Sequence, residues 1–462
     1  MSAVTPSDTA SPSPLLQTLD LRGRSLSYAR LRQLVPRAES AGSNVATAVA
    51  GIIDDVRARG VTALTELAAR FDGVQQQHPR VPQAELDAAL QALDPDVAAA
   101  LAESIDRAKA FAAAQVPDET LVEVAPGAVV RQKWIPVRRV GLYVPGGLAA
   151  YPSSVVMNTV PAMAAGVESV ALASPPQSDN GGLPHPVILA AAALLGIEEV
   201  YAIGGAQAVA AFAYGVDGAG EGVDGSGGAS AAETIEPVDI VTGPGNVFVA
   251  TAKRLVKGVI GIDAEAGTTE IAILADETAR SSLVAADLIS QAEHDPAAAS
   301  VLVTDSVQLA ESVQSAVAER AAATKHTERV HTALSGSQSG VVLVDDIEQG
   351  IAVCDAYAAE HLEIHTREAA AVAGRIRNAG AIFIGDYAPV SLGDYCAGSN
   401  HVLPTGGTAA FASGLNVHTF LKAVQLVDYD RGALQEVSGH IRHLSASEDL
   451  PAHGEAVDAR FE

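Results

Sequence analysis

The sequence predicts an α/β protein in which helices pack on buried parallel sheets, and three observations favour this class. The chain has 462 residues, which is too long for one ordinary core, and 48% of them are hydrophobic. Only 4% are aromatic, so the core must consist mainly of Ala, Val, Leu and Ile, which favours helices on parallel strands over an all-β sandwich. Short apolar segments also lead repeatedly through a glycine turn into a helical pattern.

The N-terminal part begins with a tail and continues as helices. Residues 1–14 are rich in Ser, Thr and Pro and lack an apolar core, so we expect a disordered tail over residues 1–18 and no signal peptide. From about residue 44 to 116 the apolar spacing is helical. Residues 121–144 are richer in β-branched side chains and predict extended segments.

Residues 141–263 repeat a strand, a glycine turn and a helix, which is the pattern of a parallel α/β sheet. No Gly-x-Gly-x-x-Gly opens a helix there, so the usual dinucleotide fingerprint is absent. The turns Gly204-Gly205 and Gly243-Pro-Gly245 nevertheless let a phosphate approach a helix N-terminus, although tight turns alone also explain them. Gln207 and Asn246 follow these turns and either bind a cofactor or serve the helix N-terminus.

The C-terminal half repeats the alternating pattern and then changes composition. Strands are predicted at residues 271–274, 300–303, 340–344 and 381–384, with helices between them. Residues 413–450 are mostly helical in pattern, so we expect residues 409–462 to form a small helical module that does not fold alone. A Gly- and Ser-rich stretch at 216–232 interrupts the preceding region and predicts a flexible surface insertion.

The composition limits the partners and the compartment. A formal net charge of −26 repels nucleic acid and anionic membranes and favours a small-molecule function. No stretch is long and apolar enough to span a membrane. Cys354 and Cys396 are the only cysteines, which excludes a disulfide framework and a four-cysteine zinc site and fits a reducing cytoplasm.

A short polar cluster, Gln291-Ala-Glu-His294, ends an apolar helical run just before Asp295-Pro296. Positions three apart share one helix face, so Gln291 and His294 point the same way, while Glu293 points elsewhere. Their oxygen and nitrogen atoms suit a metal or a polar substrate. The value of this signal depends on partners elsewhere in the chain.

Further polar positions follow this cluster. Glu360 and His361 are adjacent; an imidazole titrates near neutrality and suits proton abstraction, and a carboxylate can activate water. Adjacent residues do not share a helix face, which favours two separate roles, although such a pair taken alone is more often part of an ordinary charged surface helix. Asp394 lies in a glycine-rich loop, where it either ligates a metal or makes a turn. His453 lies in a C-terminal segment where an isolated histidine is usually inert.

Taken together, these segments resemble the histidinol dehydrogenase family over roughly residues 20 to 460. No single segment is specific, but seven in the same order are. The matching segments are Gly141-Leu-Tyr-Val-Pro-Gly-Gly147, Gly204-Gly-Ala-Gln-Ala208, Gly243-Pro-Gly-Asn246, Ser290-Gln-Ala-Glu-His294, Ala359-Glu-His-Leu362, Gly393-Asp-Tyr395 and Gly398-Ser-Asn-His-Val-Leu-Pro-Thr405.

The resemblance implies two Rossmann-like parallel-sheet domains that lack the Gly-x-Gly-x-x-Gly fingerprint, together with a small helical C-terminal module. The first α/β domain would comprise residues 19–140 and 264–408 and carry the metal and catalytic residues. The second, residues 141–263, would bind NAD. Residues 409–462 would form the dimerisation module.

The same resemblance implies a cytoplasmic homodimeric enzyme that oxidises L-histidinol to L-histidine through L-histidinal, with two NAD, at the last step of histidine biosynthesis. One Zn2+ per subunit would be held by Gln291, His294, Asp394 and His453, a plausible set of two imidazoles and two oxygen donors. In the family the C-terminal module of one subunit completes the site of the other.

The resemblance also implies a role for each remaining residue of the site. His361 would be the base that takes the alcohol proton, and Glu360 would activate the water that attacks the aldehyde. The NAD contacts would be Tyr143, Gln207 and Asn246. The substrate contacts would be Thr269, Gln291, His294, His361, Asp394, Glu448 and His453.

The chain departs from the family pattern in two places. Where many members read Ala-Gly-Pro-Ser-Glu, this chain reads Ala266-Gly-Thr-Thr-Glu270, in which Thr269 keeps a hydroxyl. The stretch at 216–232 is also atypical and falls between two segments expected to contact the cofactor.

Three other functions compete with this interpretation. An enzyme of the same fold acting on a sulfonated diol would call for Arg or Lys where Glu448 stands. A zinc hydrolase with Glu360 as its base would need no NAD, so protection against unfolding by NAD discriminates it. A binding protein without catalysis leaves the assembly of proton-transfer and ligand residues without a purpose.

Overall fold

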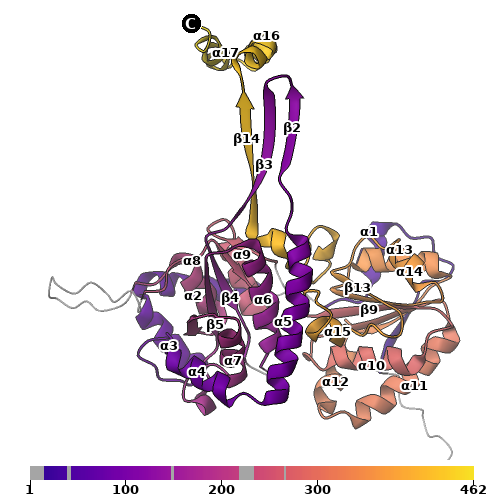
Figure 1. The fold of residues 1–462 in the computed structure, drawn as a ribbon. Coiled ribbons are helices and arrows are strands. Elements are labelled where there is room, and N and C mark those ends of the chain that lie inside the picture. The colour runs from indigo at the N-terminus through magenta and orange to yellow at the C-terminus, as the bar shows by residue number, and fades with distance from the viewer. Residues whose placement is uncertain (1–14, 39–42, 147–149, 218–233, 265–266) are drawn as a thin grey trace, which may run out of the picture.

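The computed structural model describes residues 15–38, 43–146, 150–217, 234–264 and 267–462, and it confirms an α/β protein with parallel sheets (Figure 1). Most of the expected tail at 1–18 and most of the expected insertion at 216–232 lie outside these residues. At the base of that insertion, Val216 forms an antiparallel bridge with Ile235.

The first sheet has six parallel strands in the order β1-β11-β10-β9-β12-β13. The strands are β1 (Gln17–Asp20), β9 (Glu270–Ala275), β10 (Ala299–Thr304), β11 (Gly340–Leu343), β12 (His361–His365) and β13 (Ala381–Ile384). One face packs on α10 (Ser281–Ala292), α11 (Val307–Ala323) and α12 (Thr327–Ser335), and the other on α1 (Tyr28–Leu34), α13 (Ile347–Tyr357) and α14 (Ala369–Ala373). The four strands predicted in this region are confirmed, whereas β1 and β12 were not predicted.

The second sheet has five parallel strands in the order β6-β5-β4-β7-β8. The strands are β4 (Arg139–Tyr143), β5 (Ser169–Ser174), β6 (Glu199–Ala202), β7 (Ile240–Thr242) and β8 (Gly261–Ile262). One face packs on α4 (Gln83–Ala92), α5 (Pro95–Gln115), α6 (Pro152–Ala165) and α7 (Pro186–Leu194), and the other on α2 (Ser43–Arg59), α3 (Val61–Phe71), α8 (Gly205–Tyr214) and α9 (Val247–Val256).

The helices α2 to α5 therefore share a core with the second sheet, although we expected them with the first domain. The physical reason is the packing of their alanine-rich and leucine-rich faces. Helix α2 packs on α8 and α9, α4 packs on α7, and α5 packs on α6. The domain boundaries themselves stay a prediction.

A narrow antiparallel sheet projects from the body as a stalk (Figure 1). It consists of β2 (Thr120–Ala125), β3 (Ala128–Pro136) and β14 (Leu421–Tyr429), and it carries α16 (Arg431–Ser447) and α17 (Pro451–Asp458) at its far end. The two helices confirm the helical C-terminal module. The prediction that residues 413–450 are mostly helical missed β14, because a strand paired over nine residues with β3 takes its stability from that pairing rather than from local propensity.

No helix within the described part of the chain is long and apolar enough to cross a membrane. Both cysteines are free thiols; Cys354 is buried and Cys396 is partly exposed.

Candidate active site

The strand order of the first sheet brings separate polar segments to one edge. Thr269 precedes β9, and Glu360 precedes β12, whose first residue His361 pairs with Ile271 of β9. In a strand–helix–strand unit the helix runs back along the sheet, so α10 ends at the edge where β9 begins. The last turn of α10 thus carries Gln291 to the same place as Thr269 and Glu360.

A continuous hydrogen-bonded chain joins these three segments. Gln291 Nε2 donates to Thr269 Oγ1 at 2.7 Å, and Thr269 Oγ1 donates to Glu360 Oε2 at 2.6 Å. The backbone N–H of Glu270 donates to the same carboxylate oxygen at 3.0 Å. A hydroxyl has one proton, so a threonine that donates to the ionised carboxylate must accept from the amide of Gln291. This fixes the amide orientation and turns Gln291 Oε1 away from Thr269.

Glu360 is a buried carboxylate whose protonation is finely balanced. Its pKa is raised to about 7, mainly by burial and also by the charge of Asp394, while the donors Thr269 and Glu270 and the charge of His294 oppose the rise. Asp394 and His294 therefore lie within electrostatic reach of Glu360. A carboxylate with a pKa near neutrality can both take and return a proton at physiological pH.

His361 is a buried imidazole without hydrogen bonds. Neither of its ring nitrogens has a partner among the described residues, and Nδ1 lies 3.7 Å from Glu360 Oε2, beyond hydrogen-bond distance. Burial lowers its pKa, while the negative charges of Asp394 and Glu363 oppose that shift. His361 is therefore neutral near pH 7, with a free nitrogen lone pair that suits a general base.

Asp394 is held by a bridge between the two α/β units. It lies in α15 (Val390–Tyr395), and its backbone carbonyl accepts from His401 Nδ1 at 3.0 Å. His401 Nε2 lies 3.2 Å from the hydroxyl of Ser154 in α6. Since a carbonyl only accepts, Nδ1 carries the proton and Nε2 accepts from Ser154. Burial lowers the pKa of His401, which agrees with a neutral ring.

The donor set at this edge fits a metal ion. The atom Gln291 Oε1 is buried and has no hydrogen-bond partner among the described residues, which is costly for an amide oxygen unless a ligand satisfies it. His294 is half-buried three residues further on, and its charge and that of Asp394 both reach Glu360. Between Gln291 and His294 in sequence, Glu293 lies 3.8 Å from His326, which precedes α12.

A second group of possible metal ligands lies further along β12. Asp287, Glu363 and His365 each offer one atom within 4.8 Å of the others. However, His365 Nε2 and Glu363 Oε2 are already 3.2 Å apart, at hydrogen-bond distance. This group therefore fits proton sharing better than metal binding, whereas the free Gln291 Oε1 favours the edge of the sheet.

Glu448 and His453 do not join this site within one chain. Both are exposed residues of the C-terminal module at the far end of the stalk (Figure 1).

The three predicted NAD contacts lie at the carboxyl edge of the second sheet. Tyr143 ends β4, Gln207 lies in the first turn of α8, and Asn246 precedes α9. Strand β4 is the point where the strand order reverses, since β5 lies on one side and β7 on the other, and open α/β sheets bind ligands at such a point. Their presence at one edge fits the prediction of a dinucleotide site, which stays untested.

Two of these residues also have structural partners. The hydroxyl of Tyr143 accepts from the backbone of Gly205 at 3.1 Å, and burial raises its pKa to about 12. Asn246 Oδ1 accepts from Phe248 and Val249 and thereby caps α9. The capping reading of Asn246 is thus correct for its oxygen.

A buried ion pair that the sequence did not reveal shapes the turn after β7. Lys253 forms an ion pair with Asp263, and both side chains are almost fully buried. Lys253 Nζ donates to the carbonyl of Gly243 at 3.0 Å, and the N–H of Gly243 donates to Asp263 at 2.8 Å. Gly243 has a φ of +118°, and a Cβ there would meet the carbonyl oxygen of Tyr143 at 2.0 Å, so only glycine fits.

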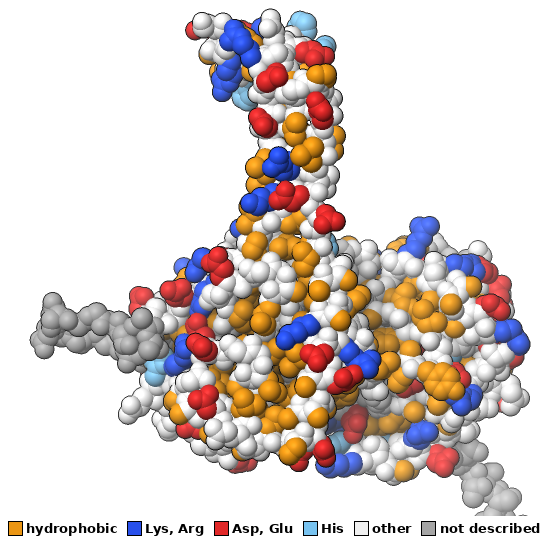
Figure 2. Space-filling model, in the orientation of Figure 1, with side chains coloured by type: hydrophobic (Ala, Val, Ile, Leu, Met, Phe, Trp, Pro, Cys, Tyr) orange, Lys and Arg blue, Asp and Glu red, His pale blue; other side chains and the backbone are white. Residues whose placement is uncertain are grey.

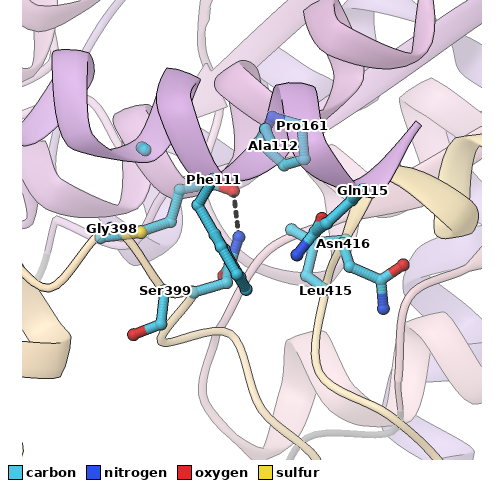
Figure 3. A pocket seen from close by; sticks show the side chains of 11 residues that line it. Phe111, Ala112, Gln115, Pro161, Gly398, Ser399, Leu415 and Asn416 are labelled. Atoms are coloured by element: carbon cyan, nitrogen blue, oxygen red, sulfur yellow. Dashed lines mark hydrogen bonds between the residues drawn. The ribbon is translucent and has the colours of Figure 1, made fainter.

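Figure 3 shows a small hollow between α5, α6 and the loop that holds Gly398. It is lined by side chains such as Phe111, Gln115 and Asn416, with Asn400 bonded to the carbonyl of Met157 at 2.6 Å. No predicted site residue lines it, so it does not mark the active site.

The chain is similar to known proteins over nearly its whole length. A family model described as histidinol dehydrogenase matches residues 35–461. A protein of that name from Nocardia farcinica is 59% identical over 447 residues, covering 97% of this chain and 98% of its own, and one from Thermobifida fusca is 58% identical with the same coverage. The crystal structure of histidinol dehydrogenase from Elizabethkingia anophelis superposes with a TM-score of 0.88 at 29% identity, covering 98% of this chain and 99% of that one.

Proposed function

The chain belongs to the histidinol dehydrogenase family, and on that premise we propose that Glu360 and His361 divide the chemistry of the reaction between them. The reaction is the NAD-dependent oxidation of L-histidinol to L-histidine through L-histidinal, the last step of histidine biosynthesis. The assignment depends on one observation: a hydrogen-bonded chain orients Glu360, while the adjacent imidazole of His361 is left free.

His361 is the base of the first oxidation. Its neutral ring accepts the hydroxyl proton of the alcohol, and its burial excludes water that would compete for that proton. The two nitrogens without partners leave the ring able to reach the substrate oxygen without breaking an existing hydrogen bond.

Glu360 serves the second oxidation. Its ionised carboxylate takes a proton from the water that adds to the aldehyde carbon. Thr269 and the backbone of Glu270 hold one carboxylate oxygen and stabilise the charged form against burial. The 3.7 Å gap to His361 Nδ1 keeps the two residues from exchanging a proton directly.

We assign the metal to Gln291, His294, Asp394 and the partner subunit's His453, and the cofactor to the edge formed by Tyr143, Gln207 and Asn246. When bound, zinc orients and polarises the substrate and NAD takes the hydride. Gln291 is suited to a ligand role because Thr269 occupies its amide nitrogen and leaves its oxygen free. Thr269 and Glu448 of the partner subunit complete the substrate contacts in this proposal.

A homodimer explains the stalk. Its strands expose apolar side chains to an unusual degree: Leu121, Val122, Val124, Val424, Leu426 and Val427 are all exposed, Val427 to 69%. Figure 2 shows hydrophobic side chains on the stalk and on the face of the body below it. An apolar surface of this kind is typical of an interface, and a second copy bound there would carry its C-terminal module to the site. The free thiols fit a cytoplasmic location.

The division of labour predicts separable defects. Wild-type protein with L-histidinol and NAD should yield two NADH per substrate. His361→Asn should abolish histidinol oxidation, while Glu360→Gln should mainly slow the oxidation of supplied L-histidinal, each by about 10²- to 10⁴-fold. Equal loss of both half-reactions in Glu360→Gln contradicts the assignment.

Shared sites predict complementation between two inactive variants. In a mixed dimer of His361→Asn and His453→Ala subunits, one site combines the intact His361 of one chain with the intact His453 of the other. Random exchange should therefore restore about a quarter of the wild-type activity. A mixture that stays inactive, although mixed dimers are present, rules out a ligand from the partner subunit.

A further inference from the structure

Strand β12 carries a row of polar side chains along one buried face. Side chains alternate along a strand, and Leu362 and Ile364 pack in the core with α13 and α14. His361, Glu363 and His365 therefore face the other side, where α10 packs. Glu363 is fully buried, and a buried carboxylate is costly unless hydrogen bonds and charges compensate it.

Glu363 connects this strand to the helix that carries Asp394. Its Oε1 accepts from the backbone N–H of Val390, the first residue of α15, at 3.1 Å. Its Oε2 lies 3.2 Å from His365 Nε2. Asp394 lies one helical turn beyond Val390, so the carboxylate of Glu363 fixes the start of the segment that ends at the proposed metal ligand.

We propose that Glu363 is a positioning residue of the active site, which holds α15, and with it Asp394, against the strand that begins with His361. This inference depends on the proposed roles of Asp394 and His361. Glu363, two residues beyond the base in the same strand, would act by positioning other residues and would take no part in the chemical steps.

Other titratable and charged groups surround Glu363. His365 Nδ1 lies 3.5 Å from Asp386, which pairs with Arg280 at 3.1 Å. Burial lowers the pKa of His365, but the hydrogen bonds to Glu363 and Asp386 and the charges of Glu363 and Asp287 together outweigh it, so the net shift is upward and favours an imidazolium. Burial raises the pKa of Asp287 to about 7, as does the charge of Glu363, while Arg320 of α11 opposes this.

These charges distinguish Glu363 from its neighbours. Glu363 is the member of this group that accepts from the backbone of Val390, and it lies on the same strand face as His361. The charge of Glu363 also favours the protonated form of His361. A purely structural carboxylate would influence stability, but not the metal affinity or the acid limb of the rate profile.

Two variants separate the hydrogen bond from the charge. Glu363→Leu removes both, and we expect zinc to bind about 10- to 100-fold more weakly in a calorimetric titration. Glu363→Gln keeps an acceptor for Val390 and removes the charge, so it should bind zinc nearly as wild type does. The acid limb of the pH profile of kcat with L-histidinol should move to lower pH in Glu363→Gln, because the loss of a neighbouring anion lowers the pKa of His361.

Glu199→Gln is the matched control, since it removes an ion-paired and largely buried carboxylate from the second sheet, where it pairs with Arg139. It should change only the melting temperature. The inference is overturned if Glu363→Leu binds zinc as wild type does, or if the rate profile of Glu363→Gln does not move. If Glu363→Leu does not fold, the profile of Glu363→Gln decides alone. If the wild type does not bind zinc, or if His361→Asn stays active, the proposed function is overturned instead.

Discussion

Replacing Thr269 by valine removes one hydroxyl from the centre of the site while keeping the shape of the side chain. That hydroxyl donates to Glu360 at 2.6 Å and lowers its pKa, which burial holds at about 7. A hydrogen bond to a charged group contributes about 1.5–3 kcal/mol, and about 1.4 kcal/mol corresponds to a tenfold change in an ionisation constant. We therefore expect the pKa of Glu360 to rise by about 1 to 2 in Thr269→Val.

The assay follows NADH formation from supplied L-histidinal between pH 6 and pH 10. Water activation needs ionised Glu360, so the acid limb of the profile should move to higher pH by about 1 to 2 in the valine variant. Thr269→Ser keeps the hydroxyl and serves as the control, with a profile close to that of wild type. Coincident profiles for the valine and serine variants would refute the claim that this hydroxyl stabilises the carboxylate.

Three further outcomes follow from buried charges and the metal. Lys253→Met leaves Asp263 buried without its partner, so urea unfolding should show a loss of about 3–5 kcal/mol, and the KM for NAD should rise because the turn at Gly243 is freed. Burial raises the pKa of both Glu270 and Glu360 from 4.5 to about 7, so the folded state binds these protons more tightly. The stability that these two protonated groups contribute is complete below pH 4.5 and is lost as the pH rises through 7, by about 3 kcal/mol each. Urea unfolding at pH 5 and pH 9 should show this loss. An equal free energy of unfolding at the two pH values contradicts it. A chelator should lower both activity and melting temperature, zinc at 100 times its Kd should restore about 2.7 kcal/mol, and unchanged melting without metal would argue against the site.

The alternating pattern in the sequence was enough to predict most of both parallel sheets. Glycine turns at Gly204 and Gly243 indicated the carboxyl ends of β6 and β7, because the residues of a turn themselves determine its backbone conformation. Strands β1, β12 and β14 escaped prediction because their stability comes from partners far along the chain. Gln17 pairs with Gly340, and Leu421 with Pro136, and no local pattern records such a pairing.

The error at β12 hid part of the site. Residues 359–362 had a surface helix as their open alternative, but Glu360 and His361 lie at the start of a fully buried strand. In a strand, His361, Glu363 and His365 share one face, whereas in a helix His361 and His365 share a face without Glu363. A strand assignment would therefore have singled out Glu363 and His365 from the sequence alone. The ion pair of Lys253 and Asp263 left no comparable signal, because its members lie ten positions apart, one in α9 and the other after β8.

The position of the base and the carboxylate follows from the direction of the strands. Ligands of open α/β sheets usually bind beyond the carboxyl ends, as the predicted NAD contacts do at β4, β6 and β7. The proposed catalytic residues lie instead at the amino edge of the first sheet, where β9 and β12 begin and α10 ends. The contact of Ser154 with His401, at 3.2 Å, joins the two units beside Asp394. In this proposal, a cofactor bound at the carboxyl edge of one sheet thus lies near the proton-transfer groups at the amino edge of the other.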